Sequence, residues 1–461
     1  MMEGRGNRHA LVLPYPIQGH INPMLQFSKR LESHGLRITF LVPNSDPSSL
    51  GIDAGSIKIK PISDGSDTDV VTGDDLGTSI NAGMRRFEIK VRESLRGFLE
   101  SDEYHDDPAD VMIYDSIISW ALDVSLEFGI RGAMFFTQPC FVTAVYYLVG
   151  QGVVRVDEKG RSVEGLPPLM SMLEFRDLPS FVAQGEAYPG LTRIFFEQFS
   201  NFREAKWLLF NTFFELEEEV VNWVANQWPL ILTIGPTIPS LYLDKRLAND
   251  KDYSLSLAKP ETETCINWLD SKDPDSVAYV SFGSLASLGE DQMVEIARGL
   301  KRIKKNFLWI VRESEEKKLP QGFADEVSGK GLMVRWCPQL QVLAHQAVSC
   351  FLTHCGWNST LEALSLGVPM VVMPQWTDQP TNAKLIVDVW GAGVRIKADG
   401  TGMVTAEEVE MCINDIMVEE KGKAIREKSS RWKELARMAL EGGGSSDLNI
   451  QKFVSDISLR A

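Results

Sequence analysis

The sequence predicts an α/β protein made of two Rossmann-like domains whose parallel sheets face a central cleft. Short runs of β-branched and aromatic residues alternate with longer amphipathic runs, which is typical of parallel strands connected by helices. This alternation stops at a polar stretch, residues 243–259, and then restarts. The 461 residues also suit two or three domains, at about 150 residues per domain.

The first domain is expected to cover residues 1–242. Its predicted strands are residues 9–13, 37–42, 56–60, 111–114, 133–136, 206–210 and 231–234. Its predicted helices are residues 22–34, 84–99 and 215–225, with one more from about residue 119 and one after Pro139. An irregular stretch at residues 150–190 contains Pro167 and Pro168, and loops of this kind in α/β proteins often shape a pocket.

A linker is expected at residues 243–260, followed by a second domain at residues 261–440. Its predicted strands are residues 277–282, 307–311, 332–336, 349–352 and 370–373. Its predicted helices are residues 262–269, 291–304, 358–366 and a helical stretch at 406–440. Three glycines, Gly442 to Gly444, separate this domain from a last helix within residues 441–461.

The composition excludes several classes of partner. Acidic residues outnumber basic ones by 63 to 47, which gives a formal net charge of -16. Binding to nucleic acid or to anionic membranes needs a clustered basic surface, so we expect neither. The six cysteines form no CxxC pair and are too few for a disulfide scaffold, which predicts reduced thiols in a cytoplasmic protein.

Neither a membrane-spanning nor a targeting segment is expected. The longest apolar segment, residues 133–149, is interrupted by Gln138 and Pro139, which fits a buried strand followed by a helix. The apolar run near the N-terminus is cut short by Pro14, and no small-residue cleavage site follows it.

The richest motif is the octapeptide THCGWNST at residues 353–360, between a predicted strand and a predicted helix. Gly356 allows close approach of the backbone to a ligand, and Asn358, Ser359 or Thr360 can cap the helix. The free N–H groups and the positive dipole end of such a helix suit a pyrophosphate, and His354 can add either a donor or a positive charge. The alternative is an ordinary helix start beside a packed histidine.

Glu362 lies one helical turn beyond Ser359 on the same face. In dinucleotide-binding folds an acidic residue accepts hydrogen bonds from a ribose, and Glu362 is a candidate for that role. The alternative interpretation is a capping box formed with Ser359.

His20 follows the first predicted strand in the tripeptide Gln18-Gly19-His20, where it faces the expected cleft. The pKa of a free imidazole suits a general base. Asp115 ends the strand at residues 111–114, and an Asp bonded to a His fixes the tautomer and stabilises the imidazolium. The alternatives are a histidine that satisfies loop carbonyls and an aspartate that caps a turn.

A third polar group follows the strand at residues 370–373. Asp378 and Gln379 place a carboxylate beside an amide, a combination that suits hydrogen bonds to sugar hydroxyls, and Trp376 adds an apolar surface. The alternative is a polar loop that caps the next helix.

Several enzyme classes lack their motifs. No G-x-G-x-x-G opens a helix after a strand, and neither a P-loop nor a G-x-S-x-G elbow occurs. No H-E-x-x-H or other close metal-binding cluster is found among the six histidines, so we expect no metal site.

At this point a family resemblance emerges. The stretch at residues 336–379 begins with WCPQ, contains HCGWNS and ends with WTDQ. It resembles the signature box of plant secondary-product UDP-glycosyltransferases of family 1, which have the GT-B fold. The similarity extends to QGHINP at 18–23, YDS at 114–116 and SFGS at 281–284. The stretch YLDKR at 242–246 resembles the subgroup that forms glucose esters or glucosylates triterpenoid, steroid, phenolic and thiohydroximate acceptors.

The resemblance implies roles for residues at matching positions. His20 is expected to be the base and Asp115 its orienting partner. Trp336 would stack on uracil, Cys337 would pair with its edge through the backbone, and Gln339 and Glu362 would hold the ribose. The remaining donor-binding residues are expected to be Gly19, Thr137, Ser284, His354, Gly356, Trp357, Asn358, Ser359, Trp376, Asp378 and Gln379. The Gln that ends the box favours glucose, and the last helix resembles the family's tail that returns to the N-terminal domain.

The expected reaction is one inverting displacement on UDP-glucose without a metal, which gives a β-glucoside of a small lipophilic acceptor. Steroids, triterpenoids, flavonoids and other phenolics are the expected acceptors, and we expect a monomer. The apolar candidates for the acceptor pocket, each of which also fits a core position, are Tyr15, Ile21, Phe87, Phe136, Phe141 and Phe181. The alternatives are a transferase that forms glucose esters on carboxylic acids, and a non-catalytic sugar-nucleotide-binding protein.

Overall fold

The computed structural model describes residues 8–44, 55–65, 76–157, 162–253, 255–256 and 258–459. The chain divides into two compact units. The first unit comprises Met1–Phe175, Ser180–Leu257 and Met438–Ala461, and the second comprises Arg176–Pro179 and Ala258–Arg437. The stretch expected as a linker therefore lies in the first unit up to residue 257, and the C-terminal helix also belongs to that unit.

The first unit is built on a seven-stranded parallel sheet with the order β3-β2-β1-β4-β5-β8-β9. The chain runs outward from β1 to β3 and then returns to place β4 on the other side of β1, which makes the space between β1 and β4 the switch point of the sheet. The strands are β1 (His9–Leu13), β2 (Arg37–Pro43), β3 (Lys58–Ile62), β4 (Val111–Asp115), β5 (Arg131–Phe136), β8 (Trp207–Phe210) and β9 (Ile231–Thr233).

Helices follow most of these strands, as parallel connections require. They are α1 (Gln18–Ser33), α2 (Leu76–Leu99), α3 (Asp102–Asp106), α4 (Trp120–Glu127), α5 (Cys140–Gly150), α6 (Ser180–Ala183), α7 (Pro189–Glu197), α8 (Phe214–Ala225) and α17 (Ser445–Ser458). The irregular stretch contains a short antiparallel pair, β6 (Arg155–Val156) and β7 (Val163–Glu164).

Helix α1 starts four residues earlier than the sequence predicts, at Gln18 instead of Asn22. The prediction was wrong because Pro23 lacks a backbone donor and disfavours a helical turn before it, yet it lies inside α1. As a result, His20 lies in the first turn of a helix and not in a loop.

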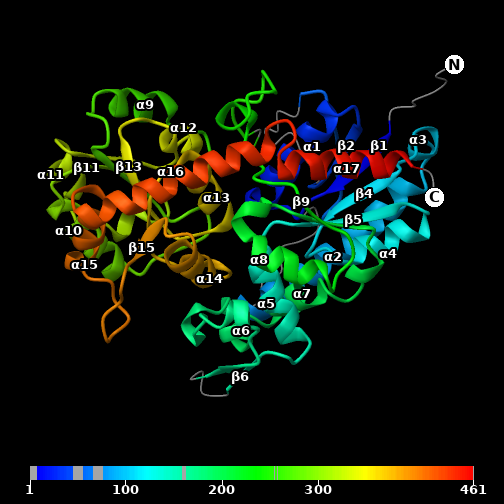
Figure 1. Ribbon diagram of the computed structural model, residues 1–461, viewed down its shortest axis with the longest axis horizontal. Helices are drawn as coiled ribbons and strands as arrows, with labels where there is room; N and C mark the ends of the chain where they lie inside the picture. Colours follow the sequence, from blue (N-terminus) through cyan, green and yellow to red (C-terminus); the bar gives the residue numbers. More distant parts are fainter. Residues whose placement is uncertain are drawn as a thin grey trace. The chain divides into compact units, whose positions relative to one another are not determined.

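Helix α17 packs beside β9 in the first unit (Figure 1). Its Ser446 donates to the carbonyl of Gly235 at 2.6 Å, and Asn449 donates to the carbonyl of Thr233 at 3.0 Å. Phe453 is fully buried, with its ring 5.1 Å from that of Trp207. These contacts attach the end of the chain to the first sheet.

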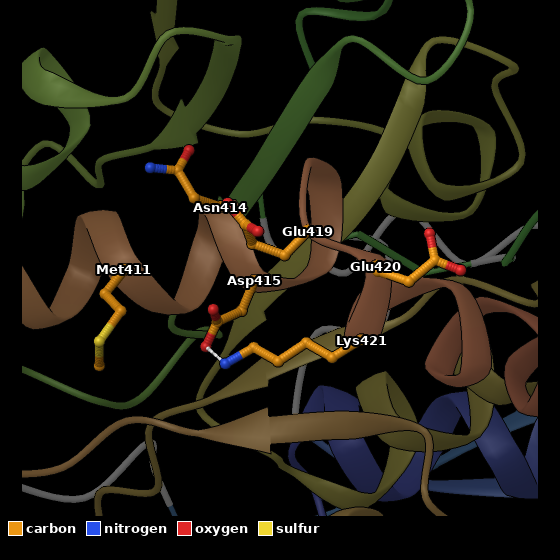
Figure 2. A pocket seen from close by; sticks show the side chains of 6 residues that line it. All are labelled: Met411, Asn414, Asp415, Glu419, Glu420 and Lys421. Carbon is orange, nitrogen blue, oxygen red and sulfur yellow. Dashed lines mark ion pairs between the residues drawn. The ribbon is translucent and has the colours of Figure 1, made fainter.

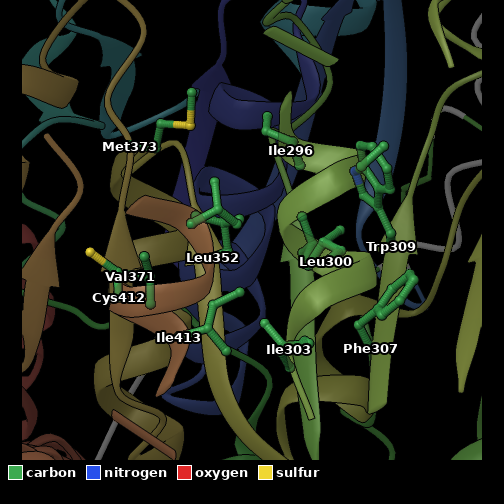
Figure 3. Packing of buried hydrophobic residues seen from close by; sticks show 14 of the residues in the cluster. Ile296, Leu300, Ile303, Phe307, Trp309, Leu352, Val371, Met373, Cys412 and Ile413 are labelled. Carbon is green, nitrogen blue, oxygen red and sulfur yellow. The ribbon is translucent and has the colours of Figure 1, made fainter. Parts of the chain in front are cut away.

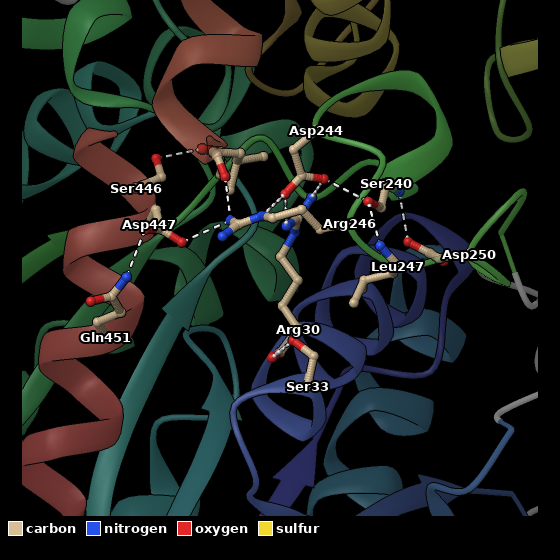
Figure 4. Close-up of polar contacts among 12 residues, drawn as sticks. Arg30, Ser33, Ser240, Asp244, Arg246, Leu247, Asp250, Ser446, Asp447 and Gln451 are labelled. Atoms are coloured by element: carbon tan, nitrogen blue, oxygen red, sulfur yellow. Dashed lines mark hydrogen bonds and ion pairs between the residues drawn. The ribbon is translucent and has the colours of Figure 1, made fainter. Parts of the chain in front are cut away.

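An ion-pair network, buried except for the 42% exposed side chain of Arg246, joins α1, the segment after β9 and α17 (Figure 4). Arg30 donates to both oxygens of Asp244 at 2.9 and 3.3 Å, and Arg246 bridges Asp244 and Asp447, each at 2.7 Å. Burial alone would raise the pKa of Asp244, but hydrogen bonds and charge from Arg30 outweigh burial and hold the pKa well below its ordinary value. This part of the expected linker is therefore fixed on the first unit.

The second unit repeats the same design with a six-stranded parallel sheet in the order β12-β11-β10-β13-β14-β15. Its switch point lies between β10 and β13. The strands are β10 (Val277–Ser281), β11 (Asn306–Ile310), β12 (Gly331–Val334), β13 (Val348–Thr353), β14 (Met370–Val372) and β15 (Gly393–Arg395). The helices are α9 (Thr262–Asp270), α10 (Glu290–Arg302), α11 (Phe323–Val327), α12 (Gln339–Leu343), α13 (Trp357–Leu366), α14 (Gln379–Lys384), the π-helical turn η8 (Leu385–Val389), α15 (Ala406–Met417) and α16 (Glu420–Leu440).

Helices α10 and α15 cover one face of this sheet (Figure 3). Leu300 from α10 and Ile413 from α15 are fully buried with Trp309 of β11 and Leu352 of β13. Burial of each such side chain contributes roughly 1.5–3 kcal/mol, so this layer is a main source of the unit's stability.

The predicted α/β fold with two parallel sheets is confirmed. Every predicted strand is present, with bounds that differ by no more than two residues at either end. The helical differences are larger: α2 begins at Leu76, and the stretch predicted at residues 406–440 is two helices, α15 and α16. Within the described ranges, none of the helices combines the length and the apolar character that crossing a membrane requires.

Candidate active site

His20, Asp115 and Thr137 meet at the switch point of the first sheet. His20 follows β1, Asp115 is the last residue of β4, and Thr137 follows β5 directly. These three strands are neighbours and run parallel, so their carboxyl ends lie at the same edge of the sheet. Side chains from well-separated parts of the sequence are thereby brought together where α/β sheets bind ligands.

The geometry of the three side chains fixes the orientation of the imidazole. Oδ2 of Asp115 lies 2.6 Å from Nδ1 of His20, and Oγ1 of Thr137 lies 3.2 Å from the same nitrogen. Oδ1 of Asp115 accepts a hydrogen bond from the backbone N–H of Ile117 at 3.2 Å. The Asp115 side chain is fully buried, whereas that of His20 is 16% exposed. A carboxylate against Nδ1 favours the tautomer with its proton there, which leaves Nε2 able to accept a proton.

One of the apolar residues predicted for the acceptor pocket, Tyr15, lies beside His20, and a second, Phe87, packs on Tyr15. The ring of Tyr15 is 5.7 Å from that of His20 and 5.3 Å from that of Phe87. Tyr15 and Phe87 are half-buried, and burial raises the pKa of Tyr15, with a further contribution from Asp115. These rings give the histidine an apolar surface on a site that is otherwise polar.

The other four pocket candidates are buried. Phe136 stacks on Phe210 with a centroid distance of 4.3 Å, and Phe181 stacks on Phe195 at 4.8 Å. Ile21 and Phe141 are 1% and 5% exposed. Gly19, the residue before His20, is exposed.

Glu217 is a buried residue near this site that sequence reasoning missed. Its carboxylate accepts hydrogen bonds from the backbone N–H groups of Cys140 and Phe141, at 3.0 and 2.8 Å, at the start of α5. Burial raises its pKa, and these bonds oppose the rise. Glu217 therefore fixes the start of the helix that follows Thr137. It occurs in an acidic run, so nothing in the sequence distinguishes it from its solvated neighbours.

The second sheet places the glycine-containing motifs at its own switch point. Gly283 and Ser284 follow β10, and His354 follows β13. Gly356 is the N-cap of α13 and supplies no side-chain cap, so the expected caps Asn358, Ser359 and Thr360 lie inside the first turn. The capping box that Ser359 and Glu362 were expected to form as an alternative is therefore wrong. A ten-residue helix starts here, and the positive end of its dipole lies at Gly356.

Gln339, Ser359 and Glu362 form one hydrogen-bonded group. The amide nitrogen of Gln339 donates to Oε2 of Glu362 at 2.6 Å and to the hydroxyl of Ser359 at 2.9 Å. The hydroxyl of Tyr279 in turn donates to Oε1 of Gln339 at 2.9 Å and lies 3.2 Å from Sγ of Cys337. Tyr279 was missed because a tyrosine inside an apolar strand resembles an ordinary core residue.

The loop at residues 375–379 is held by its own side chains. Oε1 of Gln379 accepts from the backbone N–H groups of Gln375 and Trp376 at 2.9 and 3.1 Å. Asp378 accepts from Asn382 at 2.8 Å, and Asn382 also donates to the carbonyl of Cys355 at 2.9 Å. Asn382 thus ties this loop to the loop that carries His354. Sequence reasoning missed it because it lies one turn inside α14.

The remaining predicted residues lie around the same edge of the second sheet. Trp336 is half-buried after β12, and its carbonyl accepts from the N–H of Glu261 at 3.0 Å. Trp357 is 4% exposed, with its ring 6.0 Å from that of Trp390. The carbonyl of Ser284 accepts from Arg312 at 2.5 Å, and Arg312 also donates to the carbonyl of Ala286. Arg312 is a fourth residue that the sequence did not reveal.

A surface pocket of about 520 Å³ lies elsewhere on the second unit, where α15 leads into α16 (Figure 2). It is lined by Met411, Asn414, Asp415, Glu419, Glu420 and Lys421, and Lys421 pairs with Asp415. None of the predicted site residues lines it. Across the part of the chain that the structure describes, no group of three or more His, Cys, Asp or Glu side chains is arranged to hold a metal ion.

Comparisons with known proteins give consistent matches. Residues 246–431 match the family model described as "UDP-glucoronosyl and UDP-glucosyl transferase". UDP-glycosyltransferase 74E2 of Arabidopsis thaliana is 48% identical over 98% of this chain and 99% of its own length. A mogroside I-E synthase of Siraitia grosvenorii is 42% identical over 98% of each chain. The crystal structure of Os79 from O. sativa in complex with UDP has a TM-score of 0.87 at 36% identity, and the match covers 97% of this chain and all of that one.

Proposed function

The chain belongs to the family of UDP-glycosyltransferases, and from this premise we propose that it transfers glucose from UDP-glucose to a hydroxyl group of a small lipophilic acceptor, with inversion, to give a β-glucoside. The family resemblance drawn from residues 336–379 is confirmed by the matches above, as are the GT-B fold and the glycosyltransferase class. The observation that carries the proposal is the 2.6 Å contact between Nδ1 of His20 and Oδ2 of Asp115.

An alcohol is a weak nucleophile at neutral pH because its proton is held tightly. Nε2 of His20 accepts that proton as the acceptor oxygen attacks the anomeric carbon, and Asp115 stabilises the imidazolium that forms. General-base assistance of this kind contributes about 10²–10⁴ to the rate. The half-buried ring of Tyr15 beside His20, with that of Phe87 packed on it, supports an apolar acceptor.

Departure of UDP places negative charge on the diphosphate. The N-terminus of α13, whose N-cap Gly356 supplies no side chain, is a site at which such charge is stabilised. In the proposal Ser284, His354, Asn358 and Ser359 contact the diphosphate, with Trp357 alongside. These groups supply the electrostatic stabilisation that the leaving group needs, so the proposed reaction uses no metal ion.

The nucleoside and the sugar are assigned to the rest of the same sheet edge. Trp336 and Cys337 take the uracil, and the hydrogen-bonded pair Gln339 and Glu362 takes the ribose. Asp378 and Gln379 take the glucose hydroxyls, with Trp376 beside them and with Gly19 and Thr137 contributed by the first unit.

We also propose a cytoplasmic monomer. All six cysteines are free and buried, which is consistent with a reducing compartment. Sedimentation equilibrium of the full chain tests the monomer, because a mass of twice 51.5 kDa would contradict it.

The experiment is turnover of UDP-glucose against a panel of steroid, triterpenoid, flavonoid and carboxylic-acid acceptors, with EDTA present. Mass spectrometry identifies the product, and proton NMR assigns the anomer. We expect a β-glucoside from the native protein and from His105→Ala, which changes an exposed histidine of α3, and a rate about 10²–10⁴ times lower from His20→Ala. If the main product is a glucose ester, the acceptor group is a carboxylate and not a hydroxyl. Binding of UDP-glucose without any product would favour the non-catalytic alternative.

A further inference from the structure

The imidazole of His354 lies against two glycines that leave no room for a side chain. A Cβ atom at position 356 would lie 2.6 Å from Nε2 of His354 and 3.2 Å from Cε1. A Cβ atom at position 283 would lie 2.6 Å from Nε2 and 2.7 Å from Cε1. Contacts below about 3 Å are repulsive, so the ring keeps its position only while both residues are glycine.

The topology of the sheet explains why these residues converge. Ser281, near the end of β10, pairs with Thr353, the last residue of β13, so the two strands end level with one another. Gly283 and His354 then leave the sheet side by side at the switch point. Gly356 is two residues further on, at the N-cap of α13, so the contact with Gly356 also places Nε2 at the start of that helix.

The surroundings of His354 favour a neutral ring with its proton on Nε2. Nδ1 is buried and has no hydrogen-bond partner, whereas Nε2 lies beside Gly356 at the start of α13, where the proposed diphosphate would accept its proton. The partial positive charge at the N-terminus of α13 also disfavours an imidazolium. Burial lowers the pKa of His354 to about 4, and among the described residues no carboxylate or cation contributes to the shift.

We propose that Gly283 and Gly356 are positioning residues, which hold His354 as a neutral Nε2–H donor to the diphosphate of UDP-glucose. This inference rests on the proposed function, because it needs the diphosphate at the start of α13. In this proposal His354 binds the diphosphate through the dipole of its Nε2–H bond and not through a positive charge on the ring. Binding of UDP-glucose should therefore not follow an imidazole titration between about pH 5.5 and 8.

The chain offers a matched control for each glycine. Gly356 has φ −58 and ψ 143 as the N-cap of α13, and Gly289 has φ −63 and ψ 156 as the N-cap of α10. Gly283 has φ +74, and Gly322 has φ +75. A Cβ at 289 or 322 meets nothing within 4 Å. Gly289→Ala and Gly322→Ala therefore reproduce the backbone cost of the two test substitutions without the contact to His354.

The test measures UDP-glucose affinity by calorimetry and kcat and KM with the acceptor found above. We expect Gly356→Ala and Gly283→Ala to weaken UDP-glucose binding by about tenfold or more, while both controls stay within about twofold. In a His354→Ala background, Gly356→Ala should add less than about twofold, because the ring it displaces is gone. The inference would be overturned if Gly356→Ala weakened UDP-glucose binding as much in the His354→Ala background as in the native protein. It would also be overturned if the two control variants lost as much affinity as the test variants. Gly356→Ala carries no left-handed strain, so it keeps the test valid if Gly283→Ala fails to fold.

A spectroscopic readout is independent of activity. Nitrogen-15 NMR of the histidine rings at pH 6 should show His354 as the neutral Nε2–H tautomer, and a protonated His354 would contradict the proposal. Failure of the native protein to bind UDP-glucose would sink the proposed function and this inference together. Unchanged binding in His354→Ala would sink the inference alone and leave the proposed function standing.

Discussion

Asp115 Oδ2 lies 2.6 Å from Nδ1 of His20, and the two residues are separated by 95 positions in the sequence. Strands β1 and β4, which carry them, are neighbours in the sheet because the chain reverses its direction of winding at this point. The carboxylate is fully buried and its second oxygen accepts the N–H of Ile117, so neither partner of the pair is free to reorient. A single contact thereby defines the tautomer of the proposed base.

Loss of the Asp115 carboxylate should slow catalysis without changing the binding of UDP-glucose. We expect Asp115→Asn to lower kcat by about 10²–10⁴, because the amide no longer stabilises the imidazolium. The affinity for UDP-glucose should not change. Steady-state kinetics and calorimetry measure the two quantities, with Asp123→Asn on the exposed surface of α4 as the control. A variant that keeps its native kcat would show that Asp115 only supports the fold.

Tyr279 is expected to act on the ribose through Gln339 and Glu362. Burial raises the pKa of Tyr279 well above its ordinary value, so its hydroxyl remains a donor to Gln339 at neutral pH. We predict that Tyr279→Phe raises the KM for UDP-glucose about three- to tenfold while kcat changes little. The effect should be smaller with a 2′-deoxyribose donor, which has one hydroxyl fewer to bind. Tyr104→Phe, also buried, serves as the control, and equal effects on both donors would argue against the ribose role.

Arg312 should also affect the binding of UDP-glucose, because it holds the loop after β10. It holds the carbonyls of Ser284 and Ala286, which belong to the loop after β10. Arg312→Gln should raise the KM for UDP-glucose about three- to tenfold, since the loop loses two charge-assisted bonds. Arg298→Gln, in which the replaced side chain is 65% exposed, should leave KM unchanged. An unaltered KM in Arg312→Gln would mean that the loop keeps its shape without this side chain.

The ion pair between Arg30 and Asp244 should stabilise the first unit in a pH-dependent way. Because the folded pKa of Asp244 lies below its unfolded value, the stabilisation is present above about pH 4 and is lost as the pH falls through the folded pKa. Arg30→Met should lower the free energy of unfolding by about 3 kcal/mol at pH 7, because it leaves a buried carboxylate with fewer partners.

Urea denaturation at pH 7 and pH 3 measures this effect, and the difference between native protein and variant should shrink at the lower pH. The matched control is Arg37→Met, which removes an exposed pair with Asp107 whose side chains are 45% and 42% exposed. That change should cost less than about 1 kcal/mol. Equal costs for the two variants would contradict a stabilising role for the buried network.

The sequence predicts most of the sheet and the polar residues at its edges, because both follow from local patterns. Apolar strand runs locate β1, β4, β10 and β13, and the residues directly after a strand fall at the ligand-binding edge by geometry alone. The order of the strands, and with it the meeting of His20 with Asp115, depends on long-range pairing. Spacing in the sequence does not encode that pairing, so the residues alone left it as one of two alternatives, and the family resemblance favoured it.

The residues that sequence reasoning missed share one property. Tyr279, Arg312, Glu217 and Asn382 act by holding another side chain or loop, and each occurs in a segment whose composition is ordinary. The start of α13 was misplaced for a related reason. Ser and Asn are favoured N-caps, yet the helix begins one residue after Gly356, where no side chain interferes with His354.

The central claim is that His20 is the base that activates the acceptor. Its most direct test compares native protein and His20→Ala in a single assay that records UDP-glucose binding by calorimetry and glucoside formation by mass spectrometry. We predict that in His20→Ala kcat falls by about 10²–10⁴ while the dissociation constant of UDP-glucose stays within about twofold of the native value. Glucoside formation at the native rate by His20→Ala would contradict it.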